Sequence, residues 1–216
     1  MKNNRKALLL VLCAVMMITA SIFGTLAYLT DSEAVANTFT VGAVGVSLDE
    51  AKVNEMGEAI PDENRVTENQ YHLLPGHEYT KDPTVVVDET SESCYVFVEV
   101  VNNIAAFEDS ANTIAAQIAD NDWTKLEGVE DVDNVYYKLY TKAEGNTVED
   151  RTMVVFSNFK ISGTANNVDG WSAITNEGNA PTVVTVTAYA IQKDGFNTPV
   201  DAWTAGNKTV ANGGWN

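Results

Sequence analysis

Short runs in which side chains alternate between two faces most constrain the fold of this 216-residue chain. In one run, Val184, Val186, Ala188 and Ala190 share one face, and the residues between them share the other. A period of two is that of a β-strand, whose successive side chains point to opposite faces of a sheet. Runs of this kind occupy residues 38–48, 84–87, 93–102, 135–141, 152–161 and 182–192.

Turn-forming residues separate the runs. Clusters of Gly, Asn, Asp and Pro, such as Pro75-Gly76 and residues 166–170, lie between them and indicate turns. Many short strands punctuated in this way predict an all-β fold, an antiparallel β-sandwich, and we expect the jelly-roll type. The run at 38–48 changes its alternation beside Gly42 and Gly45, which indicates either a bulge or burial on both faces.

One short helix is expected in a connection between strands. Residues 111–119 follow Ser110, a good N-cap, and place Ile114 and Ile118 four apart on one face. The polar stretch at residues 49–70 predicts a long exposed loop.

The amino terminus predicts a signal peptide. Basic residues precede an uncharged apolar run at residues 7–23, and Thr25 and Ala27 place small residues at the positions that a signal peptidase inspects. We expect cleavage between Ala27 and Tyr28, leaving a secreted single domain over residues 28–216. The alternative is a membrane anchor, but the run is shorter than the roughly 20 residues that a span needs.

The chain is strongly acidic, with a formal net charge of −17. Nucleic-acid binding requires clustered Lys and Arg, so this charge argues against a nucleic-acid partner and also against anionic membranes. Repulsion between acidic surfaces makes self-association sensitive to salt and divalent cations.

Little in the sequence indicates catalysis. His72 and His77 are five residues apart with Pro75-Gly76 between them, so they cannot form the zinc-binding helix of a metallopeptidase. Nucleophile-elbow, P-loop and dinucleotide motifs are also missing. Cys94 is the one cysteine outside the predicted signal peptide. It lies on an apolar strand face and is expected to be buried. We therefore expect no enzyme, no catalytic residues and no cofactor.

Two further groups of residues leave alternatives open. The acidic residues 127–133 lack the order of a calcium-binding EF-hand loop and are interpreted as a solvated loop, with calcium binding as the alternative. Trp123, Trp171 and Trp203 each lie beside a turn. Such rings either stack on sugars, as in a carbohydrate-binding module, or pack over the edges of a core.

Several segments resemble the TasA/camelysin family. The residues that carry the resemblance are the GTLAYLTDSE and NTFTVG segments at 24–33 and 37–42, Leu74-Pro75-Gly76, the YVFV segment at 95–98, Trp123, Tyr136-Tyr137, and the AYAIQ segment at 188–192. The first two are similar to the processing site and first strand of proteins cleaved by a dedicated SipW-type signal peptidase.

The resemblance implies a jelly-roll subunit of biofilm matrix fibres, located in the extracellular matrix or at the cell surface. In such proteins the freed amino-terminal segment adds as a strand to the next subunit. The donor segment would be residues 28–41, with Tyr28, Phe39 and Val41 as apolar anchors. The alternative is that these residues form the first strand of their own domain. The expected partners are copies of this chain, the SipW-type peptidase and other matrix components.

Two other functions compete with the fibre subunit. One is a monomeric secreted adhesin or carbohydrate-binding module, suggested by the tryptophans beside turns. The other is a camelysin-type metallopeptidase, which we do not transfer to this chain because the metal-binding helix is missing from its sequence.

Overall fold

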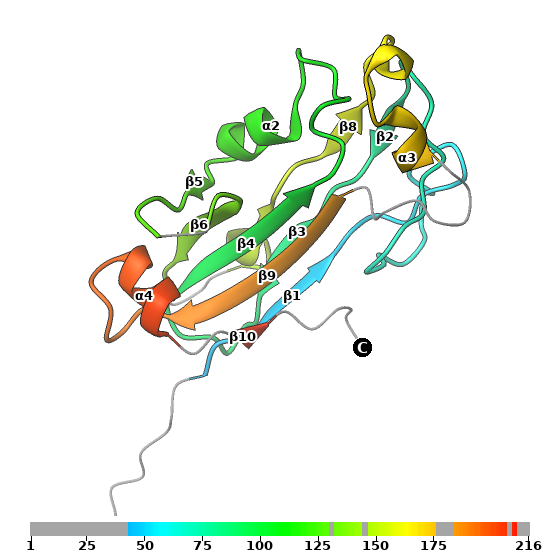
Figure 1. Ribbon diagram of the computed structural model, residues 1–216. Coiled ribbons are helices and arrows are strands. Elements are labelled where there is room, and N and C mark those ends of the chain that lie inside the picture. The colour runs from blue at the N-terminus through cyan, green and yellow to red at the C-terminus, as the bar shows by residue number, and fades with distance from the viewer. Residues whose placement is uncertain (1–42, 130–131, 144–146, 176–183, 207–208, 211–216) are drawn as a thin grey trace, which may run out of the picture. The chain divides into compact units, whose positions relative to one another are not determined.

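The fold is built mainly from antiparallel β-strands, as the alternation predicts (Figure 1). The computed structural model describes residues 43–129, 132–143, 147–175, 184–206 and 209–210. The largest sheet has five strands in the order β10-β9-β4-β6-β5. Its strands are β4 (Cys94–Asn102), β5 (Thr124–Lys125), β6 (Val135–Tyr140), β9 (Val184–Gln192) and β10 (Thr209–Val210).

The other strands form a three-stranded and a two-stranded sheet, and the β3–β7 pairing of the first continues into the β2–β8 pairing of the second after one interruption. A three-stranded sheet has the order β1-β3-β7, and β2 pairs with β8. Their bounds are β1 (Val46–Asp49), β2 (Glu78–Thr80), β3 (Thr84–Val87), β7 (Thr152–Val154) and β8 (Asn158–Lys160). Lys81 N donates to Ser157 O and Val155 N to Pro83 O across the interruption. Because Pro83 has no N–H, regular pairing stops here and resumes in the same register.

The run at residues 152–161 was therefore predicted incorrectly as one strand. The structure divides it into β7 and β8, separated by residues 155–157.

Both larger sheets contribute to one main core. Cys94, Val96 and Val98 of β4 enter it together with Val85 of β3 and Met153 of β7. Cys94 is fully buried, which confirms the prediction. Burial of each such apolar side chain contributes about 1.5–3 kcal/mol.

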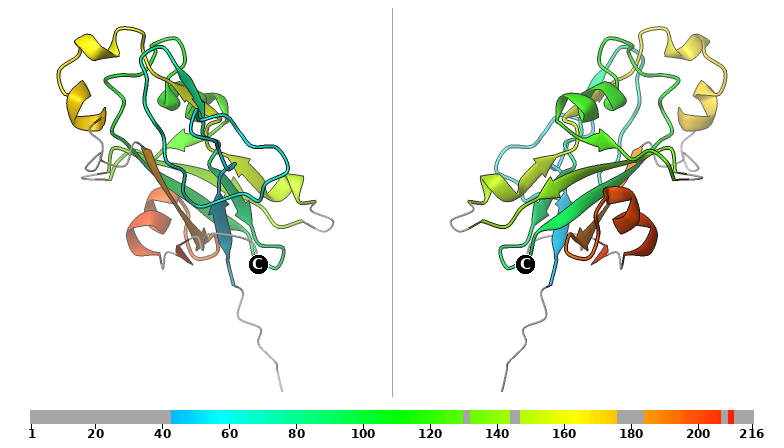
Figure 2. Two further views of the ribbon diagram at one scale, coloured as in Figure 1. Left: turned by 90° about the vertical axis from the view of Figure 1, so that its right-hand side faces the viewer. Right: turned by 90° about the vertical axis from the view of Figure 1, so that its left-hand side faces the viewer.

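A second apolar cluster covers the opposite face of the five-stranded sheet. Tyr95 and Phe97, which alternate with the core residues of β4, pack there with Ile191 of β9. Helix α4 (Pro199–Ala205) lies over them, and its Trp203 ring is 5.1 Å from the ring of Phe97. Figure 2 shows α4 at the end of the domain opposite to α3 (Trp171–Thr175).

The prediction of a single helix was wrong. Besides α3 and α4, the described residues contain α2 (Ile114–Asp120) and two short 3₁₀ turns. Helix α2 lies in the predicted segment but begins later, because the side chain of Thr113, not Ser110, accepts the N–H of Ala116. None of these helices is long and apolar enough to cross a membrane.

The segment at residues 49–70 is exposed over most of its length, as expected, but its beginning is not. Asp49 and Glu50 are buried, with 4% of each residue exposed. Glu50 pairs with Val66 through two backbone hydrogen bonds of 2.8 Å. The hydrogen bonds and ion pairs described below hold the segment against the ends of β1 and β3.

Candidate assembly edge

The side chain of Gln117 covers the outer edge of the successive strands β7 and β8, on the side away from β3 and β2. Its Oε1 accepts the N–H groups of Ser157 (3.0 Å) and Asn158 (3.3 Å), and its Nε2 donates to Asn158 O (2.9 Å). These backbone groups belong to the β7–β8 side of the sheet. A helix side chain therefore takes the place that a further strand would fill.

Asn121 and Trp123, which follow α2, cover the next part of the same strand edge. Asn121 Nδ2 donates to Val155 O at 3.2 Å, and Trp123 Nε1 donates to Val154 O at 2.8 Å. Trp123 is buried, with 4% of its surface exposed, and the ammonium of Lys138 lies 5.2 Å from its ring. The β7–β8 edge is thus covered by the segment that runs from α2 to β5.

Within the described part of the chain, strand β1 forms an edge without such a cover. Glu50 pairs with Val66 on the side of β1 that faces away from β3. Since backbone groups alternate along a strand, Val46 and Leu48 present their N–H and C=O groups to the same side. Among the described residues, no strand pairs with β1 there, because β1 ends its sheet.

Strand β9 lies beside β1 at this margin (Figure 1). Its partner on this side is β10, which pairs only with Tyr189 and Ala190. No described strand pairs with residues 184–188 on that side. We refer to β1 together with residues 184–188 as the open margin.

Apolar side chains at the open margin are incompletely covered. Val44 and Leu48 on the β1 side and Val186 on β9 are partly buried and pack against the main core. An added strand that covered them would remove apolar surface from water, which stabilises an association by about 25 cal/mol per Å².

The predicted processing and donor residues lie outside the described residues. They are Ala27, Tyr28, Phe39 and Val41. Their cleavage and strand exchange therefore stay predictions.

The three tryptophans that suggested sugar binding pack against the protein. Trp123 is buried against the β7 edge, as described above. The rings of Trp171 and Phe107 are 5.5 Å apart, and Trp203 packs on Phe97 and Tyr189. Their packing agrees with the second alternative, in which the rings cover the edges of a core.

The candidate reactive residues are held in structural contacts. His77 Nε2 lies 2.7 Å from Met56 O, and its ring packs on Tyr79. Burial raises the pKa of the Cys94 thiol to about 12, so it is protonated at neutral pH. Within the described ranges no three His, Cys, Asp or Glu residues form a metal-binding group; part of the acidic patch at 127–133 lies outside those ranges.

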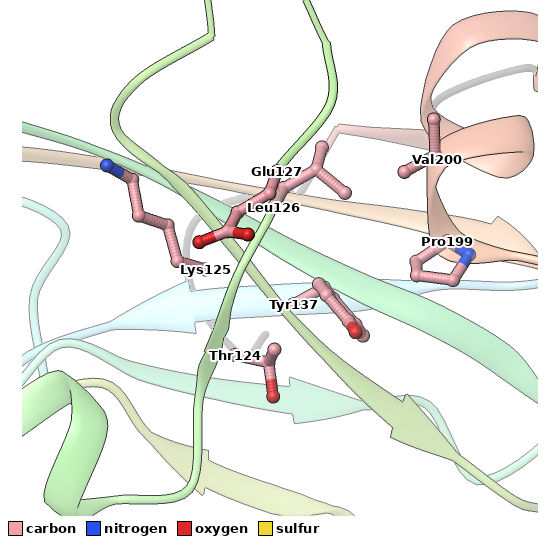
Figure 3. A pocket seen from close by; sticks show the side chains of 7 residues that line it. All are labelled: Thr124, Lys125, Leu126, Glu127, Tyr137, Pro199 and Val200. Atoms are coloured by element: carbon pink, nitrogen blue, oxygen red, sulfur yellow. The ribbon is translucent and has the colours of Figure 1, made fainter.

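A shallow pocket of about 380 Å³ lies over β5 and β6, beside the start of α4 (Figure 3). Leu126, Tyr137, Pro199 and Val200 form its apolar wall, and Thr124, Lys125 and Glu127 add polar groups. Sequence reasoning missed this pocket, because α4 was not predicted.

Sequence reasoning also missed a polar cluster at the end of β1. Arg65 donates to Asp49 Oδ1 (2.5 Å), Asp82 Oδ2 (2.8 Å) and Thr84 Oγ1 (3.0 Å), and to two backbone carbonyls. A second group is the ion pair of Lys81 with Glu50, whose members are sequence neighbours of Asp82 and Asp49. No motif marks either group, since their members are far apart along the chain.

Comparison with known proteins gives no match to a family model, a curated protein or a solved structure.

Proposed function

We propose that this protein is a secreted, non-enzymatic subunit of extracellular matrix fibres, with a jelly-roll β-sandwich fold. The observation that carries the proposal is the contrast between two sheet edges. Side chains cover the β7–β8 edge, whereas the described residues leave the open margin without a strand partner. Such an edge pairs readily with another chain unless it is blocked.

The partner at the open margin would be the amino-terminal segment of another copy. Cleavage between Ala27 and Tyr28 by a SipW-type peptidase would free residues 28–41 as a donor. Its backbone would pair with the exposed groups of β1 or β9, and Phe39 and Val41 would supply apolar side chains for the partly buried surface.

The charge of the chain sets the conditions for assembly. Cleavage after Ala27 removes three basic residues and no acidic ones, so each copy would carry a formal charge of −17 − 3 = −20. Such copies repel each other, so salt or divalent cations should accelerate association by screening.

A proline at Leu48 tests the acceptor edge. Leu48→Pro removes the N–H that faces the margin without removing a hydrogen bond to β3, because Leu48 points its backbone away from that strand. Leu48→Ala is the matched control, since it removes the same side-chain packing but keeps the N–H. We expect fibres, observed by electron microscopy, from Leu48→Ala and few or none from Leu48→Pro.

Deletion of residues 28–41 tests the donor. The shortened protein should stay monomeric, and a synthetic peptide of this sequence should bind it. Fibres formed by the shortened protein, or by Leu48→Pro as readily as by Leu48→Ala with both folded by circular dichroism, would count against the proposal.

A second candidate function is a carbohydrate-binding adhesin, favoured by the pocket beside Tyr137. A sugar ring could stack on this side chain while Thr124 and Glu127 bond its hydroxyls. Binding on a glycan array that Tyr137→Ala abolishes would support this function. Casein hydrolysis that a chelator stops would instead favour a metallopeptidase, which we do not propose.

A further inference from the structure

Three side chains with complementary chemistry meet beside the end of β1. Lys81 Nζ lies 2.5 Å from Glu50 Oε2, and Asn69 Nδ2 donates to Glu50 Oε1 at 2.9 Å. One carboxylate thus holds an amine with one oxygen and a carboxamide with the other. The amine and the carboxamide are thus bound to the same carboxylate, although Asn69 and Lys81 are twelve positions apart along the chain.

The surroundings of Lys81 contain little water. Only 8% of Lys81 and 4% of Glu50 is exposed. The ring of Tyr71 lies 5.7 Å from Lys81 Nζ and packs in turn on Tyr79 and Phe159. Burial, together with the Glu50 carboxylate, raises the pKa of Tyr71. A proton that passes between Lys81 Nζ and Glu50 Oε2 therefore crosses a direct contact that little water reaches.

The carboxamide of Asn69 is held in a fixed orientation. Val53 N–H donates to Asn69 Oδ1 at 3.0 Å, and Asn69 Nδ2 also donates to Ala51 O at 2.8 Å. A donor on the carbonyl oxygen stabilises the negative charge that grows there when a nucleophile attacks the carbon. The nitrogen that would leave faces the carboxylate that could protonate it.

A structural ion pair would account for the contact between Lys81 and Glu50 alone. It does not account for the third group, a carboxamide bound by the same carboxylate and polarised from its other side. The arrangement matches a nucleophile, a proton shuttle and an activated carbonyl.

We propose that Lys81 and Asn69 join spontaneously in an isopeptide bond, with Glu50 as the proton shuttle. Glu50 takes a proton from the Lys81 ammonium, and the neutral Nζ attacks Asn69 Cγ. The tetrahedral intermediate carries its negative oxygen against Val53 N–H. Glu50 then protonates Nδ2, the Cγ–Nδ2 bond breaks and ammonia leaves. Glu50 takes the remaining extra proton from Nζ and passes it to the departing ammonia, which becomes ammonium. The Nζ–Cγ bond replaces the Cγ–Nδ2 bond, and nothing is oxidised or reduced.

Such a bond would stabilise the fold covalently. It closes the loop that contains Pro75-Gly76 and so restricts the unfolded chain, as a disulfide does. Cys94 is the sole cysteine after residue 13 and is buried, so a disulfide within residues 28–216 is impossible.

Intact mass spectrometry of the purified, folded protein tests the proposal. We expect a mass lower than the sequence mass by one ammonia. A tryptic map should show resistance to cleavage after Lys81, because its amine is acylated, and a peptide in which residue 69 is linked to residue 81. The full sequence mass with normal cleavage at Lys81 overturns the proposal.

Variants separate this reaction from other losses of ammonia, since an asparagine can also cyclise to a succinimide. Lys81→Arg, Asn69→Ala and Glu50→Gln should each restore the sequence mass of the variant. Glu63→Gln, at the exposed ion pair with Lys52, is the control and should leave the ammonia loss unchanged. Persistence of the loss in folded Lys81→Arg assigns it to a succinimide and overturns the proposal. The wild-type mass decides the question even if a variant fails to fold.

Discussion

Replacement of Gln117 with alanine tests whether side chains close the β7–β8 edge. The change removes one acceptor, shared by the N–H groups of Ser157 and Asn158, and one donor to Asn158 O. It leaves the α2 backbone in place, because alanine is the best helix former. The edge would then expose three backbone groups to solvent.

The magnitude follows from these hydrogen bonds. A hydrogen bond contributes about 0.5–1.5 kcal/mol net, and Gln117 makes two short ones and two longer ones, of 3.3 and 3.4 Å. Water can reach this half-buried site, so the lost groups are partly re-solvated. We expect the free energy of unfolding, measured by urea titration, to fall by about 1–2 kcal/mol. Gln117→Ala should also associate more readily than wild type at equal salt, since a second edge is open.

Two control variants sharpen the result. Gln117→Glu keeps the acceptor but loses the donor, so its stability should lie between those of wild type and Gln117→Ala. Asp120→Ala changes an exposed residue on the same helix and should alter stability by less than about 0.5 kcal/mol. A Gln117→Ala protein as stable as wild type, with no added association, would refute the idea that Gln117 closes the edge.

Two further predictions concern a glycine and a buried acid. Gly57 has φ +75°, and a Cβ there would lie 2.3 Å from Cδ1 of Tyr79; Gly57→Ala should therefore lower the free energy of unfolding by about 1–3 kcal/mol in a urea titration. Burial raises the pKa of Glu108, so the stability that this group contributes is present below its unfolded pKa, near 4.5, and is lost as pH rises through the folded value. Glu108→Gln keeps the acceptor for Asn102 and should match wild type in acid but exceed it at pH 7; equal stability of the two proteins at every pH from 3 to 8 would contradict the cause.

Alternation predicted the longer strands β4, β6 and β9 because it reflects burial on a sheet, but it missed the short strands β2, β5 and β10. The faces expected for β9 are those observed, with Val184 and Ala188 in the main core and Ile191 in the second cluster. Helix α4 was missed although Thr198 caps it and Pro199 occupies its first turn, which are the usual signals of a helix start. Its seven residues were too short for a helical period to stand out.

The closed edge and the polar clusters could not be predicted, for a physical reason. Local patterns report which face of an element is buried, whereas these contacts join distant segments. Gln117 meets Ser157 across forty residues, and Lys81 meets Glu50 across thirty-one. Only the folded topology brings such polar groups together, and an isolated Gln or Lys in the sequence looks like an ordinary surface residue.

The location of Arg65 becomes important if subunits are joined through their amino-terminal segments. Tension along such a fibre would reach each domain from its amino-terminal side and load β1, the first described strand, which has four residues paired with β3. Arg65 binds Asp49 at the far end of β1 and also Asp82 and Thr84, so it connects β1 to the neighbouring chain segment. Its ion pairs with Asp49 and Asp82 would have to break before the end of β1 could separate from β3.

Substitution of this arginine measures that resistance. The guanidinium uses its donors on five acceptors, but 37% of its side chain is exposed, so solvent screening reduces the value of each ion pair. Because Asp49 is 3% exposed, Arg65→Met leaves a buried carboxylate without its cation, and we expect a loss of about 2–3 kcal/mol in urea titration. Lys52→Met, at an exposed ion pair in the same segment, should cost less than about 1 kcal/mol. If the two variants lose equal stability, Arg65 does not anchor β1, and a fibre pulled through its amino termini needs another source of strength.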